Sequence, residues 1–224
     1  MKRRSTMRDK RKNKDYYRAY LDYQYSRIEK KSAKLAEAEG EKKQRVLVSL
    51  TGYEIDLLKA EFSYGSSKEN LKTLLIRAMS IASENANVSF DDLLTLLSLT
   101  VMLEAGSDAK KLIDSKASSI NDDRLLNFLS TYIENGKGDW DQSISLRIEY
   151  ELLNDVFTSD DKETALNEYL EKWYEAHSDY AWYNSHLRDT DTYCGYWSFE
   201  SAAIAHVLNL DINVLKENRY FPCL

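Results

Sequence analysis

The sequence has few of the residues that interrupt regular secondary structure. Its 224 residues include one proline, Pro222, and seven glycines. Sheet proteins need turn residues every few positions, so this scarcity argues against an all-β fold and favours helices joined by short polar connections. The composition, 43% hydrophobic and 30% charged, is that of a soluble folded protein, and the length allows one large domain or two small ones.

Long hydrophobic runs are missing too. No apolar run approaches the ~20 residues that cross a bilayer, and the basic start MKRRSTMRDKRKNKDYY has no signal-peptide core behind it. The sequence therefore predicts no membrane contact and no secretion by that route, and the expected location is the cytoplasm. The two cysteines, Cys194 and Cys223, are expected to be reduced thiols there, since neither lies in a metal-like spacing.

The motifs of common enzymes are also absent: there is no P-loop, GxGxxG, GxSxG, CxxC or HExxH. A metal site built from His177, His186, Asp189 and Asp191 is conceivable. The preferred interpretation is scattered helix-end or surface histidines, because the spacing of the first two does not place both on one helix face. We therefore predict no catalytic residue, cofactor or metal, and keep a hydrolase using His177 and His186 as an alternative that elemental analysis and turnover assays would test.

Apolar residues recur at three-, four- and seven-residue steps in residues 9–38, which predicts one long basic helix. Ser66 with Glu69 matches a capping box, and Asn121 is a candidate cap. Further helices are predicted over residues 45–65, 70–86, 93–106, 122–135, 143–157, 163–177, 198–208 and 212–218. The fold class is therefore all-α: a multi-helix bundle with a long basic N-terminal helix, forming one body or two packed helical subdomains. The polar stretch 115–123 is the best boundary, giving an N-terminal helical domain 1–118 and a C-terminal helical domain 119–224.

Charge is distributed unevenly along the chain. Residues 1–45 hold 16 Lys and Arg against 7 Asp and Glu, whereas residues 46–224 hold 15 against 30. An acidic body repels nucleic acid and attracts basic proteins, which affects association rate and choice of partner rather than fold. The sequence therefore predicts a basic protein partner.

The basic first helix carries Tyr16, Tyr17, Tyr20, Tyr23 and Tyr25 among its cations. Aromatic rings between cations can bind a nucleic-acid strand by stacking and phosphate contact, so the alternative function is a nucleic-acid-binding or regulatory module. Tyrosines three and four residues apart are also typical of a helix that packs on a bundle, and the acidic remainder of the chain favours this interpretation. The same helix could pair with a second copy, so a homodimer stays open.

An aromatic cluster lies near the end of the chain, in the stretch YCGYWSFESAAIAHVLNL. We expect Gly195 to allow a tight turn, Ser198 to cap the following helix through its hydroxyl, and Glu200 to lie in the first turn, where a carboxylate is favoured. Each large aromatic side chain buries ~150–250 Å². The cluster is therefore predicted to close the core rather than to form an active site.

This final segment resembles the C-terminal signature of the PoNi-type immunity proteins. They are antitoxins paired with PoNe-type DNase toxins in bacterial polymorphic toxin and secretion systems, for which type VI secretion is the expected route. The resemblance rests on an aromatic residue before Gly-Tyr-Trp, then a Glu-containing Ala-rich helix, Leu-Asp, and a terminal Tyr-x-Pro. The matching positions are Tyr193, Gly195, Tyr196, Trp197, Ser198, Phe199, Glu200, Ala202, Ala203, Leu210, Asp211, Tyr220 and Pro222.

The resemblance implies an immunity protein of the bacterial cytoplasm. It would bind a cognate secreted DNase toxin, a basic nuclease domain encoded next to it, and block the active site or DNA-binding groove without catalysis of its own. An acidic series with one tryptophan anchor is the candidate toxin-binding surface, although helix caps and a solvated face would give the same pattern. The candidates are Asp139, Trp140, Asp141, Glu149, Asp155, Asp160, Asp161 and Glu163.

Overall fold

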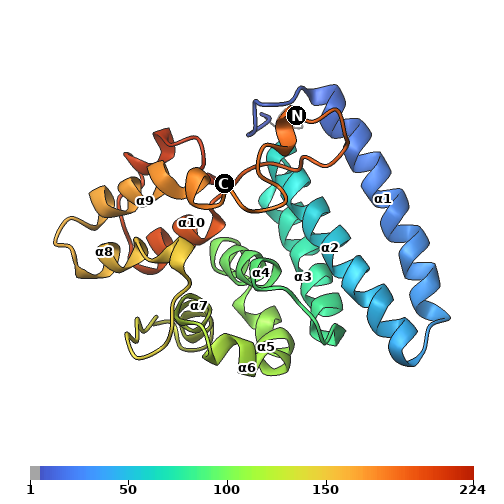
Figure 1. Ribbon diagram of the computed structural model, residues 1–224, viewed down its shortest axis with the longest axis horizontal. Helices are drawn as coiled ribbons and strands as arrows, with labels where there is room; N and C mark the ends of the chain where they lie inside the picture. Colours follow the sequence, from blue (N-terminus) through green and yellow to red (C-terminus); the bar gives the residue numbers. More distant parts are fainter. Residues whose placement is uncertain (1–5) are drawn as a thin grey trace. The chain divides into compact units, whose positions relative to one another are not determined.

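The computed structural model describes residues 6–224. Over this range the chain forms ten α-helices and three short 3-10 helices, with no strand, so the predicted all-α class is confirmed (Figure 1). The chain divides into two compact units. Unit 1 is Met1–Asp92 with Asn184–Gly195, and unit 2 is Leu93–Tyr183 with Tyr196–Leu224. The domain limits 1–118 and 119–224 stay a prediction.

Unit 1 is built on three long helices, α1 (Lys14–Ala36), α2 (Gly40–Tyr64) and α3 (Lys68–Glu84). Helix α2 packs against both of the others (Figure 1). Tyr17 and Tyr20 of α1 are buried, as are Leu47 and Leu50 of α2, because their spacing puts them on the inward face of each helix. The predicted start of the first helix was too early: the side chain of Asn13 accepts a hydrogen bond from the Tyr16 amide and caps α1.

The start of α3 differs by one residue from the predicted capping box. Ser67, not Ser66, is the N-cap, and its Oγ accepts the Asn70 amide at 3.2 Å. The Ser66 hydroxyl instead donates to the Glu61 carboxylate. The shift follows from Gly65, which ends α2 in the left-handed conformation with φ 97° and makes Ser66 part of the α2 terminus.

A late segment of the chain completes unit 1. Residues 184–195, which include the 3-10 helix η2 (Ser185–Leu187), lie near the N-terminal end of α1 (Figure 1). The Tyr16 hydroxyl donates to the Tyr193 carbonyl at 2.9 Å and accepts from the Tyr193 amide at 3.1 Å. The Ser63 hydroxyl donates to the Cys194 carbonyl at 2.7 Å. These bonds fix the returning backbone onto α1 and α2, and the Tyr193 side chain is fully buried.

Unit 2 consists of shorter helices. It begins within α4 (Phe90–Met102), whose residues from Leu93 onward are all buried, in agreement with the continuous apolar pattern there. The remaining elements follow in this order: α5 (Gly106–Ser115), α6 (Ala117–Asn121), α7 (Arg124–Asn135), η1 (Ile148–Tyr150), α8 (Leu153–Thr158), α9 (Lys162–Ala176), α10 (Phe199–Val207) and η3 (Leu215–Glu217).

Three local predictions in unit 2 were wrong. Asn121 lies inside α6, and α7 is capped by Asp123, whose Oδ1 accepts the Leu125 and Leu126 amides at 3.0 and 3.1 Å. Residues 143–157 form a loop, η1 and α8 rather than one helix. The reason is that the Arg124 guanidinium donates hydrogen bonds to the backbone carbonyls of residues 142 and 144. Residues 212–218 form turns around the short η3, since the Asp211 carboxylate binds the Asn213 amide.

Two further observations concern membrane-spanning helices and the state of a cysteine. Among the residues that the structure describes, no helix has both the length and the apolar character needed to cross a bilayer. Cys194 forms no disulfide, in agreement with the predicted reduced thiol.

Candidate functional site

Two aromatic residues of the C-terminal signature, Tyr196 and Tyr220, lie in a packed cluster within unit 2. Tyr174 of α9 stacks on Tyr220 with ring centroids 5.3 Å apart and an interplanar angle of 5°. Tyr196 packs on Tyr174 and Trp182, and its hydroxyl donates to the Trp182 carbonyl at 3.2 Å. Because Tyr196, Phe199 and Tyr220 are each at most 5% exposed, these three rings offer no open face to a ligand.

Gly195 stands where the chain passes from unit 1 into unit 2. Its φ of 116° lies in the left-handed region that L side chains rarely adopt. Glycine therefore lets Tyr193 remain in the core of unit 1 while Tyr196, three residues later, is buried in unit 2. Trp197 is half-buried, and Pro222, near the end of the chain, is buried.

The signature glutamate belongs to a buried polar network. Glu200, 5% exposed, accepts hydrogen bonds on Oε1 from the Tyr169 hydroxyl at 2.7 Å and from the Ser198 hydroxyl at 2.6 Å. Ser198 is the N-cap residue of α10 as predicted, but its hydroxyl does not cap an amide, because the carboxylate engages it. Its amide donates to the Tyr220 carbonyl at 2.9 Å. Burial raises the pKa of Tyr169 well above its ordinary value, so this phenol stays a donor.

Sequence reasoning missed Tyr169 as the partner of Glu200. The helical pattern of α9 marks Tyr169 as an inward residue, but 31 positions separate the two residues, and no local spacing joins them. The network holds the start of α10 against α9 and the last residues of the chain. Its chemistry is that of a structural hydrogen-bond network, closed to solvent.

The histidine cluster suggested by the sequence does not form. His177 is 2% exposed inside unit 2, with Nδ1 2.6 Å from the Trp173 carbonyl and Nε2 3.3 Å from the Tyr150 hydroxyl. His186 packs beside the Tyr193 ring in unit 1, and Asp189 and Asp191 are exposed. Over residues 6–224, no three His, Cys, Asp or Glu side chains gather closely enough to hold a metal ion.

The tyrosines of the basic helix fall into two sets. Tyr17 and Tyr20 are buried, and Tyr16 is bound to the Tyr193 backbone, so these rings serve packing. Tyr23 and Tyr25 are 50% and 40% exposed, and the Tyr25 hydroxyl donates to Glu61 at 2.8 Å. The tyrosines therefore do not form one continuous stacking platform, and nucleic-acid binding by this helix stays a prediction.

The predicted toxin-binding tryptophan is held by its own unit. Trp140 is half-buried and stacks on Phe157, with centroids 3.9 Å apart and planes 8° from parallel. Its Nε1 donates to Asn154 at 3.2 Å, and its ring meets the edge of Phe128. This packing leaves the exposed part of the indole next to Asp139 and Asp141 as the part that a partner can touch.

The predicted acidic residues have different local roles. Asp139, Asp155 and Asp160 are exposed. Asp141 accepts the Ser143 amide at 2.8 Å, and Asp161 caps α9 through the Thr164 amide and hydroxyl. These hydrogen bonds lower the pKa of both Asp141 and Asp161. They are therefore capping groups and fixed negative charges at once.

The two remaining glutamates are tied to neighbouring segments. Glu149 accepts a hydrogen bond from the Tyr180 hydroxyl at 2.6 Å and lies 3.9 Å from Arg147. Glu163, in the first turn of α9, accepts the Asp211 amide at 3.1 Å. Arg124, which sequence reasoning missed, binds carbonyls of residues 142 and 144 and the Asn154 side chain, and so fixes the loop that presents Asp139 and Asp141.

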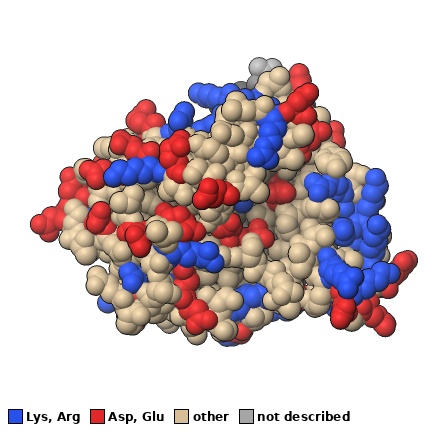
Figure 2. All heavy atoms as spheres, viewed as in Figure 1, with Lys and Arg blue, Asp and Glu red and all other residues tan. Residues whose placement is uncertain are grey.

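The charge asymmetry of the sequence becomes a difference between the two units. Unit 2 contains 10 Lys and Arg against 21 Asp and Glu, a balance of −11, whereas unit 1 contains 21 against 16, a balance of +5. Figure 2 shows acidic side chains over the part of unit 2 that holds α8 and α9, and basic ones along α1 and the start of α2. The acidic series thus lies on the unit with the excess of negative charge.

Residues 121–223 match the family model described as "PoNe immunity proteins (PoNi), C-terminal". This part of the chain is a PoNi C-terminal domain. It contains the whole acidic series and the aromatic signature, and it belongs to the PoNe immunity protein family. The match, which covers somewhat less than half of the chain, thus assigns this segment to a non-enzymatic family of immunity proteins against PoNe toxins. No curated protein and no solved structure matches the chain.

Proposed function

We propose that this PoNi protein acts in the bacterial cytoplasm by binding its cognate PoNe DNase and blocking the active site or the DNA-binding groove. The toxin would be a secreted protein, delivered by a system such as type VI secretion and encoded by the neighbouring gene. The observation that carries the proposal is the balance of −11 on unit 2, the unit that holds residues 121–183 and 196–223 of the PoNi domain.

Electrostatics gives this surface a mechanism. A DNase has to present a positive groove to the phosphates of its substrate. An acidic inhibitor is steered onto such a groove, associates quickly at low salt and excludes DNA from the space it occupies. Inhibition then requires no chemistry from the immunity protein.

The acidic surface is the proposed contact. We define it as the exposed and half-buried residues Asp139, Trp140, Asp141, Glu149, Asp155, Asp160, Asp161 and Glu163. Asp139, Asp155 and Asp160 are the members most available to a partner's Lys and Arg, because all three are exposed. Asp155 lies in the short helix α8, and the other two lie in the connections before and after it. The capping members add fixed negative charge without moving on binding, which limits the entropy lost in the complex.

Calorimetric titration with the catalytically inactive toxin domain tests the proposal, with plasmid cleavage by the active toxin run in parallel. We expect nanomolar 1:1 binding and loss of cleavage. Binding without loss of cleavage would contradict blocking of the active site or groove, and absence of binding would contradict the toxin partner itself.

A set of charge-removing variants locates the surface. Asp139→Asn, Asp155→Asn and Asp160→Asn together should weaken toxin binding and flatten its dependence on salt. Matched changes of three exposed carboxylates on unit 1, Glu37→Gln, Glu39→Gln and Glu41→Gln, should leave both unchanged. Equal effects from the two sets would mean that only total charge matters and not this surface.

A further inference from the structure

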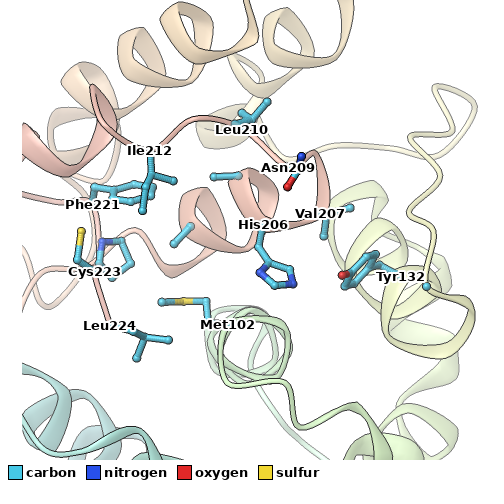
Figure 3. A pocket seen from close by; sticks show the side chains of 14 residues that line it. Met102, Tyr132, His206, Val207, Asn209, Leu210, Ile212, Phe221, Cys223 and Leu224 are labelled. Carbon is cyan, nitrogen blue, oxygen red and sulfur yellow. The ribbon is translucent and has the colours of Figure 1, made fainter.

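Unit 2 contains a groove that the acidic surface does not include, and its lining combines apolar side chains with polar ones such as His206 and Asn209. The groove has a volume of about 670 Å³ and lies between α10, the ends of α4 and α7, and the last residues of the chain (Figure 3). The small residues Ala202 and Ala205 of α10 are among those that line it. Its sides are lined by Met102, Tyr132, Leu210, Ile212, Phe221 and Leu224.

The groove exposes apolar side chains that a folded chain normally covers. Ile212 is 44% exposed and Leu224 is 50% exposed, and both lie at the groove. Each Å² of apolar surface removed from water is worth about 25 cal/mol, so a partner that fills the groove gains from this exposure. Exposed apolar surface beside polar residues is typical of an interaction site.

One edge of the groove is acidic. Asp211 stands between Leu210 and Ile212, which both line the groove, and its amide donates to Glu163 at 3.1 Å. Asp211 is exposed and Glu163 is half-buried. The Glu163 carboxylate therefore lies at the Asp211 backbone, between two residues that line the groove, and the acidic surface borders the groove at the N-terminal end of α9.

We propose that this groove binds an apolar segment of the PoNe toxin whose flanking Lys or Arg residues pair with Glu163 and Asp211. The inference rests on the proposed function and adds the apolar part of the same interface. Charge complementarity identifies the occupant, because a groove with an acidic edge on a unit of net charge −11 selects against an acidic or neutral segment. An apolar centre with a charged rim is also the usual anatomy of a tight protein interface.

The packing of Trp140 within unit 2 favours the groove, rather than the Trp140 ring, as the main apolar contact with the toxin. The Trp140 ring is engaged with Phe157 and Phe128 within unit 2, so it cannot insert into a partner without leaving that stack. The groove needs no such rearrangement, because its volume of about 670 Å³ is already open in the structure. Preorganisation of this kind lowers the cost of binding.

The decisive variant is Ile212→Glu, with Val214→Glu as its matched control. Both positions are exposed and lie in the same segment, but only Ile212 lines the groove. In calorimetry with the inactive toxin domain we expect Ile212→Glu to weaken binding about 30-fold, the size of a central interface contact, while Val214→Glu changes it less than about 3-fold. Circular dichroism melts of both variants check that the fold is kept.

The acidic edge has its own test. Glu163→Gln with Asp211→Asn removes two charges but keeps the hydrogen-bond acceptors, so the local fold should persist. We expect about 10-fold weaker binding at low salt and a smaller loss of affinity as salt is raised. The control pair Glu168→Gln with Asp179→Asn removes the same charge from exposed positions outside the groove lining and should have the smaller effect.

A photo-crosslinking residue at Asn209, which is exposed and lines the groove, identifies the occupant directly. The crosslinked toxin peptide should contain an apolar residue next to Lys or Arg, whereas the same probe at Val214 should capture it weakly. Wild-type binding with unchanged Ile212→Glu affinity would overturn the groove while leaving the proposed function intact. Failure of the wild-type protein to bind would overturn both.

Discussion

The two units of this protein hold together in different ways. Unit 1 uses helices of 23, 25 and 17 residues, joined by short connections, so most of its core is formed between neighbours in sequence. The longest helix of unit 2 has 15 residues, and its core depends on rings contributed by α9, by the loop before η2 and by the end of the chain. Unit 2 therefore depends on contacts between distant segments, which local sequence patterns do not encode.

Their buried charges are also stabilised differently. In unit 1, Glu54 is 2% exposed and is bound by the guanidinium of Arg77 through two hydrogen bonds of 2.9 and 2.7 Å. In unit 2, Glu200 is bound by two hydroxyl groups and has no cation in its hydrogen bonds. The acidic unit therefore keeps Glu200 buried without using one of its few cations in a hydrogen bond to it.

The largest expected effect comes from Glu200→Ala in unit 2. The change leaves the Tyr169 and Ser198 hydroxyls buried without their acceptor, and we expect a loss of about 3 kcal/mol in the free energy of unfolding. Urea denaturation measures it. Glu168→Ala, at an exposed position of the same unit, should cost less than about 0.5 kcal/mol. Similar losses for the two variants would show that the buried network adds nothing to unit 2.

Replacing one glycine of each unit by alanine should change stability in opposite directions. A Cβ at Gly138 of unit 2 would meet the Phe128 ring at 2.4 Å, whereas one at Gly52, inside α2 of unit 1, would meet nothing within 4 Å. We expect Gly138→Ala to destabilise by about 2 kcal/mol through displacement of Phe128. Gly52→Ala should stabilise by about 0.5–1 kcal/mol, the helix propensity difference. Thermal melts of both variants compare them, and a stable Gly138→Ala would show that the Phe128 stack adapts.

Arg77→Ala tests the buried carboxylate of unit 1. Without its partner cation, Glu54 is buried unpaired, and we expect a loss of about 2 kcal/mol at pH 7. Burial already raises the pKa of Glu54 above 4.5. The folded variant then binds more protons than the unfolded chain above pH 4.5, so its stability falls as pH rises through the raised pKa and the loss is smaller near pH 4.

Urea midpoints of Arg77→Ala between pH 4 and 7 measure this dependence. Arg45→Ala is the matched control, because its ion pair with Glu41 is exposed and should contribute less than about 1 kcal/mol. A loss for Arg77→Ala that is independent of pH would mean that Arg77 acts through packing of its side chain rather than through the charge of Glu54.

The smallest effect at neutral pH is expected for Tyr16→Phe, which removes the bonds to the Tyr193 backbone in unit 1. We expect a loss of about 1 kcal/mol. Burial raises the pKa of Tyr16 to about 12 from 10.0. The contribution of a group with a raised pKa is complete below pH 10 and is lost as pH approaches 12, so the difference between the variant and the wild type should shrink over that range.

Urea midpoints between pH 8 and 12, with tyrosinate absorbance recorded in parallel, follow this change. Tyr23→Phe serves as the control, since its ring is half-exposed and should leave the midpoints unchanged. If the stability difference between Tyr16→Phe and the wild type persists undiminished at pH 12, the raised pKa of Tyr16 does not control it.

The fold class and the family resemblance followed from the amino-acid sequence alone. Scarce proline and glycine and the periodic apolar residues predicted the all-α class, and the residues from Tyr193 to Pro222 carried the resemblance to PoNi immunity proteins. These features are local, since a helical face repeats every few residues and a signature is read along one segment. The same locality explains the errors at Ser66, Asn121 and residues 143–157, where hydrogen bonds from neighbouring or distant residues changed the local outcome.

The contacts between distant residues became visible in the folded chain. It joined Glu200 to Tyr169 and Tyr16 to Tyr193, engaged Trp140 in its own unit, and left a groove beside Glu163 and Asp211. No spacing in the sequence encodes such contacts, because they depend on how loops return over the helices. The sequence thus supplied the charge and the family signature, whereas the packing of the folded chain decided which side chains are used internally and which are left for a partner.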